Sequence, residues 1–85
     1  MIYKNKRNDI EIMAQMLKLA QEEIKKTHLM YQTNLCYTQL VYYMDFLVEK
    51  GLMDVKNGTQ NNRYFITEKG REFLYNIEKV IVQVR

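Results

Sequence analysis

The feature that most constrains the fold of this chain is a change in the spacing of its apolar residues at Gly51. Before Gly51, apolar residues recur at steps of three and four, which is typical of one face of a helix. After it, the period shortens toward two, and 52–56 and 63–66 are predicted to form two short strands. The stretch 57–62 between them opens with Asn-Gly, a common hairpin turn. The sequence therefore predicts a helix over 36–50, ended by Gly51, and then a β-hairpin with a six-residue tip.

Three further helices are predicted around this unit. The first runs over 8–26 and starts with Asn8 as its cap, from which Glu11 is correctly spaced for a capping box. A short second helix follows Thr27, and a last helix follows Thr67 and extends to the end of the chain. The predicted order is helix, short helix, helix, hairpin, helix.

This order defines the fold class as α+β, mostly helical, in the form of a winged helix-turn-helix. Eighty-five residues with 47% hydrophobic content and no proline are enough for one core but not for two. We therefore expect a single domain over 1–85. It divides into an N-terminal arm (1–7), a winged-helix core (8–66) and a C-terminal helix (67–85).

Two stretches carry a family resemblance. The runs KKTHLMYQTNLCYTQLVYYMDFLVEKGLM (25–53) and YFITEKGREFL (64–74) resemble small archaeal winged-helix DNA-binding proteins and transcription regulators of about ten kilodaltons. The resemblance extends over 6–74, which is most of the chain. It implies a homodimer joined through the last helix that binds double-stranded DNA, with helix 36–50 in the major groove and wing 56–63 at the backbone.

The exposed residues at the start of a reading helix are the ones that reach base edges. For helix 36–50 these base-contact candidates are Tyr37, Thr38, Gln39, Val41 and Tyr42. Gln39 has an alternative role, because at the third helical position it can accept a hydrogen bond from the Cys36 amide and cap the helix. The helix carries no Arg or Lys before Lys50, so the commonest contact to guanine is missing from it.

Contact with DNA phosphates must therefore come from residues outside this helix. The net charge of the whole chain is +3. The candidates lie in the arm, before the short helix and at the base of the wing. They are Lys4, Lys6, Arg7, Lys25, Lys26, Lys56 and Arg63. Each taken singly is equally well explained as a solubilising surface cation.

The C-terminal helix is the predicted dimerisation element. Its apolar residues, with a second apolar stripe on the first helix, exceed what one small core needs, and a two-fold partner would bury the surplus. The first helix is expected to face its own core through Ile10, Met13, Leu17, Ala20 and Ile24. The predicted dimer interface is Ile12, Met16, Leu19, Ile77, Val80, Ile81 and Val84. The alternative is that the second stripe encloses the last helix within one protomer.

Several function classes are excluded on composition. The single Cys36 and single His28 provide neither a disulfide nor a multi-residue metal site, so we expect no metal and no cofactor. No nucleophile-base pair or phosphate-binding glycine loop is present, so the chain is not expected to be an enzyme. No membrane-spanning segment or secretion signal is recognisable, which predicts a cytoplasmic, nucleoid-associated protein.

The expected role is that of a transcription regulator or a chromatin-associated architectural protein. The alternative is a winged-helix module that binds other proteins and not DNA, because fold does not determine function. The sequence indicates neither an operator nor an effector.

Overall fold

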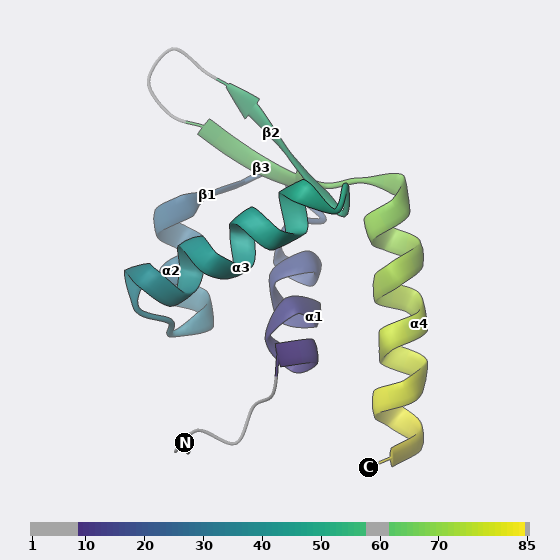
Figure 1. Cartoon of the computed structure of the whole chain (residues 1–85). Helices are drawn as coiled ribbons and strands as arrows, with labels where there is room; N and C mark the ends of the chain where they lie inside the picture. Colours follow the sequence, from purple (N-terminus) through teal and green to yellow (C-terminus); the bar gives the residue numbers. More distant parts are fainter. Residues whose placement is uncertain (1–8, 58–61, 85) are drawn as a thin grey trace.

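A computed structural model describes residues 9–57 and 62–84, and side chains through residue 80. Helices and short strands follow one another in the order that a winged helix-turn-helix requires (Figure 1). The elements are α1 (Asp9–Leu19), β1 (Ile24–Lys25), α2 (Lys26–Thr33), α3 (Tyr37–Glu49), β2 (Met53–Asn57), β3 (Asn62–Ile66) and α4 (Glu68–Val84). The predicted fold class is confirmed.

The hairpin is present, and its sheet has one strand more than predicted. The three strands are antiparallel in the order β1-β3-β2. β2 and β3 pair from Met53 opposite Ile66 to Asn57 opposite Asn62, one residue further toward the tip than the predicted strands. β1 adds to the other edge of β3, so the base of the wing is broader than a simple hairpin.

The prediction of a first helix over 8–26 is wrong at its C-terminal end. α1 ends at Leu19, and Ile24 and Lys25 pair with Tyr64 and Arg63 of β3. The sequence QEE after Ala20 contains no glycine or proline to mark this end. Pairing with a distant strand satisfies the backbone groups of Ile24 and Lys25, and local helix propensity does not report such a partner.

The start of α2 was also misplaced. Lys25, not Thr27, is the N-cap residue, with an extended backbone and no side-chain capping bond. α2 instead begins directly where β1 ends. At its other end Asn34 takes a left-handed conformation (φ 59°), which Asn tolerates better than most residues.

The two ends of α3 lie where the sequence predicts them. Cys36 is the N-cap, and Gly51 follows the last turn with φ of 77°. The Gly51 and Leu52 amides donate to the carbonyl oxygens of Val48 and Leu47 at 3.0 and 2.9 Å, which is the Schellman arrangement. α3 therefore stops abruptly, and the chain enters β2.

α4 is held to the end of α3 and to the base of the wing. The Thr67 hydroxyl accepts a hydrogen bond from the Gly70 amide at 2.9 Å and donates to the Gly51 carbonyl oxygen at 2.6 Å. Gly70 lies so close to Leu52 that a Cβ at this position would overlap the Leu52 carbonyl oxygen. Both contacts depend on these residue types, and they fix α4 relative to the wing.

α1 lies between α4 on one side and the α2–α3 pair on the other (Figure 1). Because it has neighbours on two sides, it buries residues on two sides. Ile12, Met16 and Leu17 are all buried in one continuous core, whereas Ile10 is 48% exposed. The expectation that Ile10 faces the core is therefore wrong.

The same packing corrects part of the predicted dimer interface. Ile12 and Met16 are enclosed within the core of a single chain, and so is Ile77 of α4. Leu19 is half-buried against the same core. The second apolar stripe of α1 thus encloses α4 within a single chain, which was the alternative explanation for these residues.

Candidate nucleic-acid interface

The outward face of α3 presents most of the predicted base-contact residues. Tyr37 and Tyr42 are 59% and 65% exposed, Thr38 and Gln39 are exposed, and Val41 is half-buried. The opposite face is buried in the core through Leu40, Met44 and Leu47, as its spacing predicted, and also through Tyr43. α3 is thus anchored along one side and open along the other.

Gln39 is engaged in capping. Its Oε1 atom accepts a hydrogen bond from the Cys36 amide at 3.4 Å, in the capping geometry that its spacing predicted. A contact between Gln39 and a base would require this hydrogen bond to break. Gln39 is therefore the least available of the five base-contact candidates.

Tyr43 positions α3 relative to α1. Its hydroxyl donates to the Asp9 carboxylate at 2.7 Å, and its ring meets that of Tyr42 edge-on, with centroids 5.2 Å apart. Asp9 belongs to the first turn of α1. The orientation of the exposed Tyr42 ring is thus linked to the packing of α3 on α1.

The sheet brings three of the predicted phosphate-contact residues into one row. Lys25 is opposite Arg63, and Arg63 is opposite Lys56. Residues directly opposite one another in antiparallel strands point to the same face, so these side chains share one side of the sheet. We call Lys25, Arg63 and Lys56 the basic row.

One member of the basic row is already paired. Lys56 Nζ lies 2.7 Å from a carboxylate oxygen of Glu23, and both side chains remain largely exposed. The hydrogen bond from Lys56 lowers the pKa of Glu23 below its ordinary value. Desolvation opposes this shift, and the positive charges of Lys56 and Arg63 add to it. Glu23 therefore stays ionised beside the row and offsets part of its charge.

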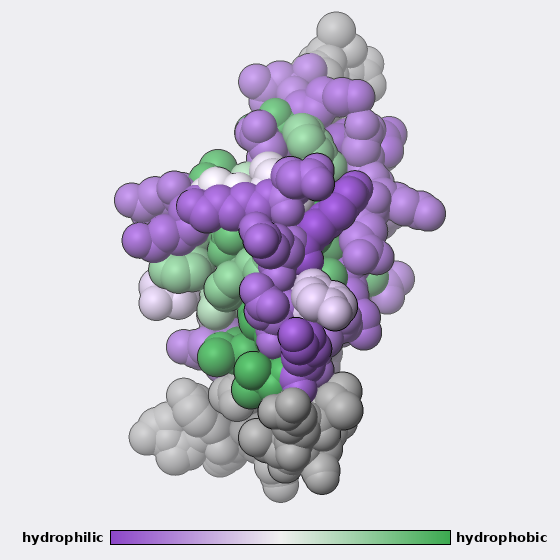
Figure 2. Space-filling view, turned by 90° about the vertical axis from the view of Figure 1, so that its right-hand side faces the viewer, coloured by the Kyte–Doolittle hydropathy of each residue, from purple (hydrophilic) through white to green (hydrophobic). Residues whose placement is uncertain are grey.

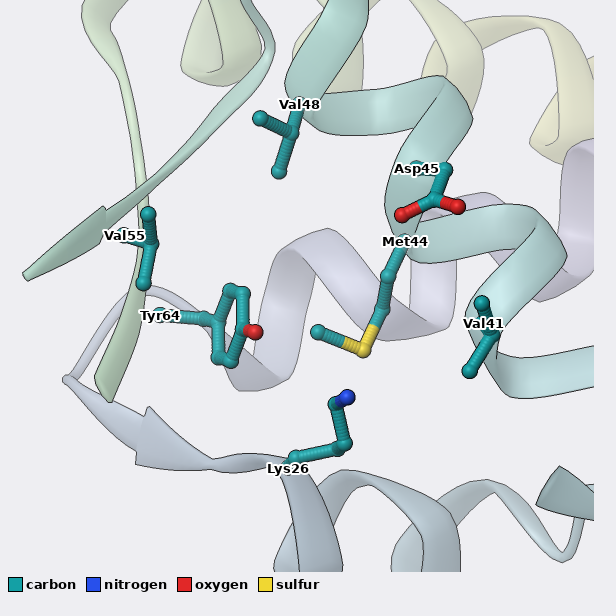
Figure 3. Close-up of a pocket in the computed structure, with 7 residues that line it drawn as sticks. All are labelled: Lys26, Val41, Met44, Asp45, Val48, Val55 and Tyr64. Atoms are coloured by element: carbon teal, nitrogen blue, oxygen red, sulfur yellow. The ribbon is translucent and has the colours of Figure 1, made fainter. Parts of the chain in front are cut away.

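A groove of about 150 Å³ lies between α3, the sheet and the start of α2 (Figure 3). Lys26, Met44 and Tyr64 point toward its centre, and Asp45 lies on its α3 side. The lining is completed by Val41, Val48 and Val55. The Lys26 ammonium also lies 5.4 Å from the centroid of the Tyr37 ring, a cation–π distance.

The groove and the basic row are on opposite faces of the sheet. Tyr64 lines the groove, and Arg63, its neighbour in β3, must point the other way because side chains alternate along a strand. Positive charge is therefore available on both faces: Lys26 beside α3, and the basic row on the far side.

An exposed apolar region lies on the other flank of α3. Met13, Tyr42 and Phe46 line a shallow hollow of about 80 Å³ with Asp9 and Tyr43. Phe46 is 36% exposed, and Ile10 lies one helical turn before Met13 on α1. This region combines side chains that a small protein usually covers.

The outward side of α4 is mainly hydrophilic. Figure 2 shows polar side chains over most of this side, with hydrophobic ones along one edge and toward the lower end of the view. Tyr75 and Val80 are the large hydrophobic side chains of α4 that are exposed among those described, Val80 at 59%. The described part of α4 therefore offers a partner only a limited apolar surface.

Some predicted site residues fall outside the described part of the chain. These are Lys4, Lys6 and Arg7 of the arm, the Asn8 cap, and the side chains of Ile81 and Val84. His28 and Cys36 are both exposed. Within residues 9–57 and 62–84, no helix is long and apolar enough to cross a membrane, and no three His, Cys, Asp or Glu side chains gather as a metal site would require.

Two features of the interface were missed from the sequence. Asp45 lies on the groove and on the open side of α3, and it could have been found by continuing the helical spacing from Thr38 and Tyr42. The alignment of the basic row had no such signal, because it depends on the pairing of β1 with β3.

Comparison with protein families assigns the fold directly. Residues 6–84 match the winged helix-turn-helix family model, and the chain belongs to this family. Among solved structures it is similar to Sso10a-2, a DNA-binding protein from Sulfolobus solfataricus. The two are 31% identical with a TM-score of 0.82, over 88% of this chain and 79% of the other. The resemblance proposed from the sequence is thereby confirmed, and winged-helix proteins of this kind are typically non-enzymatic.

More distant structures share the fold. A transcriptional regulator of the MarR family from Rhodococcus sp. RHA1 is 24% identical with a TM-score of 0.71, over 79% of this chain and 51% of the other. SSV1 F-93 is 17% identical with a TM-score of 0.73, over 96% of each chain. A comparison with curated protein sequences gave no significant match.

Proposed function

We propose that this protein binds double-stranded DNA, with α3 in the major groove and the wing at the adjacent backbone. The observation that carries the proposal is the separation of an exposed, cation-free reading helix from the basic row. Winged-helix docking needs one surface for base edges and another for phosphates. The similarity to Sso10a-2, described as a DNA-binding protein, supports the same conclusion.

The two faces of the sheet suggest how the protein contacts the DNA backbone. In double-stranded DNA, one sugar-phosphate backbone separates the major groove from the adjacent minor groove. A DNA backbone that runs between α3 and the wing would pass Lys26 and the hydroxyl of Tyr64. The basic row faces away from α3, toward the backbone on the far side of the minor groove. Lys26 and the basic row would then contact different strands of the DNA duplex.

Nuclear magnetic resonance mapping tests this docking. On addition of a short duplex at low salt, we expect the amide shifts of α3, of the start of α2 and of the three strands to change. Amides on the outward side of α4 around Tyr75 should not change, and they are the internal control. Absence of any shift at 50 mM salt would favour the protein-interaction module instead of DNA binding.

The proposed functional unit is a homodimer. Exposed apolar residues support this: Ile10 and Phe46 lie at or near the shallow hollow between α1 and α3, and Val80 is exposed on α4. Ile81 and Val84 continue the stripe of Val80 along α4 and remain part of the proposed interface. A two-fold partner would also present two reading helices to one duplex, which raises the affinity of an interface with few cations.

Sedimentation tests the dimer. Val80→Lys combined with Ile10→Lys should yield a folded monomer with weaker DNA binding, because both residues are exposed and neither supports the core. Tyr75→Lys is the matched control and should leave the dimer intact. A parent protein that sediments as a monomer at high concentration would contradict the dimer.

As a dimer on DNA, the protein would act as a transcription regulator or as an architectural protein of chromatin, inside the cell and without a cofactor. Site selection distinguishes these roles. A regulator should enrich one sequence from random duplexes, whereas an architectural protein should enrich none.

A further inference from the structure

The polar groups on the open side of α3 are unusual for a reading helix. Thr38, Tyr42, Asp45 and Glu49 follow one another at steps of four, three and four, so they form one line along the helix. This line lies opposite the buried Leu40. Its charged members are both carboxylates, and α3 contains no cation. The side that would face DNA therefore carries negative charge in its centre.

Asp45 is the member of the line closest to the groove. It is exposed, it lines the groove with Val41 and Lys26, and its carboxylate lies on the α3 side (Figure 3). Among the residues that the structure describes, none donates a hydrogen bond to the Asp45 carboxylate or forms an ion pair with it. Its oxygen atoms are available to a ligand.

An ionised carboxylate only accepts hydrogen bonds, which limits what it can face in DNA. Phosphate oxygens, and the O6 and N7 atoms of guanine, are acceptors and would be repelled. The major-groove donors are the N4 amino group of cytosine and the N6 amino group of adenine. Adenine places its N7 acceptor beside that amino group, whereas cytosine has no acceptor beside its own. Cytosine therefore fits a carboxylate best.

We propose that Asp45 determines sequence specificity by accepting a hydrogen bond from the N4 amino group of a cytosine in the major groove. The inference rests on the proposed DNA-binding function and specifies its target. Lys26, on the other side of the groove, offsets the repulsion between Asp45 and the nearby phosphates. Val41, one turn before Asp45, is apolar and suits the methyl group of a neighbouring thymine.

Site selection from random duplexes tests the proposal. The parent protein should select sites with one invariant cytosine, and replacing that base pair should weaken binding about five- to 100-fold. Asp45→Asn should lose the preference for cytosine and gain one for adenine, since an amide pairs with adenine through its N6 and N7 atoms. Preferences at the other positions should remain.

Two controls sharpen the test. Glu49→Gln removes the same charge one turn later on the same line, and it should not change the selected base because the last turn of a reading helix lies away from the bases. A duplex carrying N4-methylcytosine at the selected position should bind the parent as weakly as the replaced pair, since the methyl group blocks the donor. Circular dichroism should show that Asp45→Asn and Glu49→Gln are both folded, because both residues are exposed.

The outcomes separate the inference from the function on which it rests. If the parent binds duplexes but Asp45→Asn selects the same sites, the specificity assignment is wrong and DNA binding stands. The same holds if the parent selects no sequence, or if Glu49→Gln shifts the selected base as Asp45→Asn does. If the parent binds no duplex even at low salt, both fail.

Discussion

The reading helix and the basic row differ in nearly every property that matters for binding DNA. α3 presents tyrosines, a threonine and two carboxylates on a rigid helix, with no cation from Tyr37 to Glu49. The row presents Lys25, Arg63 and Lys56 side by side on paired strands. One surface has the chemistry to distinguish base edges and little to hold a polyanion, and the other has the reverse.

In the proposed complex, this division would place affinity and specificity on different elements. Counterion release by cations supplies most nonspecific affinity, and it is blind to sequence. Hydroxyl, carboxylate and methyl contacts distinguish bases but add little electrostatic attraction. Variants of the row should therefore act equally on all duplexes, whereas variants of α3 should change the order of preference among them.

The largest effect is expected from removing the basic row. The triple variant Lys25→Ala, Arg63→Ala, Lys56→Ala should weaken binding to all duplexes by on the order of a hundredfold or more at low salt. The slope of log affinity against log salt should become shallower by roughly three per protomer. Anisotropy titrations at several salt concentrations measure both quantities.

The matched control replaces two exposed cations of α4, Lys69→Ala with Lys79→Ala, and it should leave the slope unchanged. A triple variant that bound as tightly as the parent would show that the row makes no phosphate contacts.

A smaller and different effect is expected from α3. Thr38→Val should weaken binding to the preferred sequence by about three- to tenfold, because a hydroxyl contact to a base is lost. Binding to unrelated duplexes and the salt slope should stay as in the parent. Paired titrations with a selected and a scrambled duplex measure this, and an equal loss on both would contradict a role in base recognition.

A modest gain is expected from Glu23→Gln. The carboxylate competes with phosphate for Lys56, so its replacement should strengthen binding to all duplexes about two- to threefold and steepen the salt slope. A variant that bound more weakly would show that the ion pair holds Lys56 in position for DNA instead.

The pKa of Glu23 adds a pH dependence to the same variant. The folded-state pKa lies below the ordinary value of 4.5, so the ion pair stabilises the protein above pH 4.5, and this stabilisation is lost as the pH falls through the lowered pKa. The difference in free energy of unfolding between parent and Glu23→Gln should therefore shrink below pH 4.5. It should be small throughout, because both partners are largely exposed.

The smallest effect is expected from Cys36→Ser. A hydroxyl is a better cap acceptor than a thiol, so the change should leave stability unchanged or raise the free energy of unfolding by up to about 1 kcal/mol. Urea denaturation measures this. Cys36 is exposed, so a large loss of stability would contradict its assignment as a cap.

The sequence predicted the reading helix well because its signals are local. Cys36 and Gln39 mark its start, Gly51 marks its end, and the spacing of Leu40, Met44 and Leu47 defines its buried face. The hairpin was predicted equally well, since the shortened period of the apolar residues and the Asn-Gly turn are short-range signals.

The rest depended on contacts between distant residues. β1 forms because Ile24 meets Tyr64, forty residues later, and the basic row exists only through that pairing. Likewise, Met16 has the same local pattern whether it faces α4 of its own protomer or that of a partner. Periodicity identifies an apolar face and does not identify what covers it.

The most direct test of a divided DNA-binding surface is a titration of the parent protein with one duplex across a range of salt concentrations. With contacts from Lys26 and the three members of the basic row, log affinity should fall linearly with log salt. The slope should be about −3.6 for one protomer and about −7 for a dimer. Affinity that is absent at low salt, or that does not change with salt, would contradict the account.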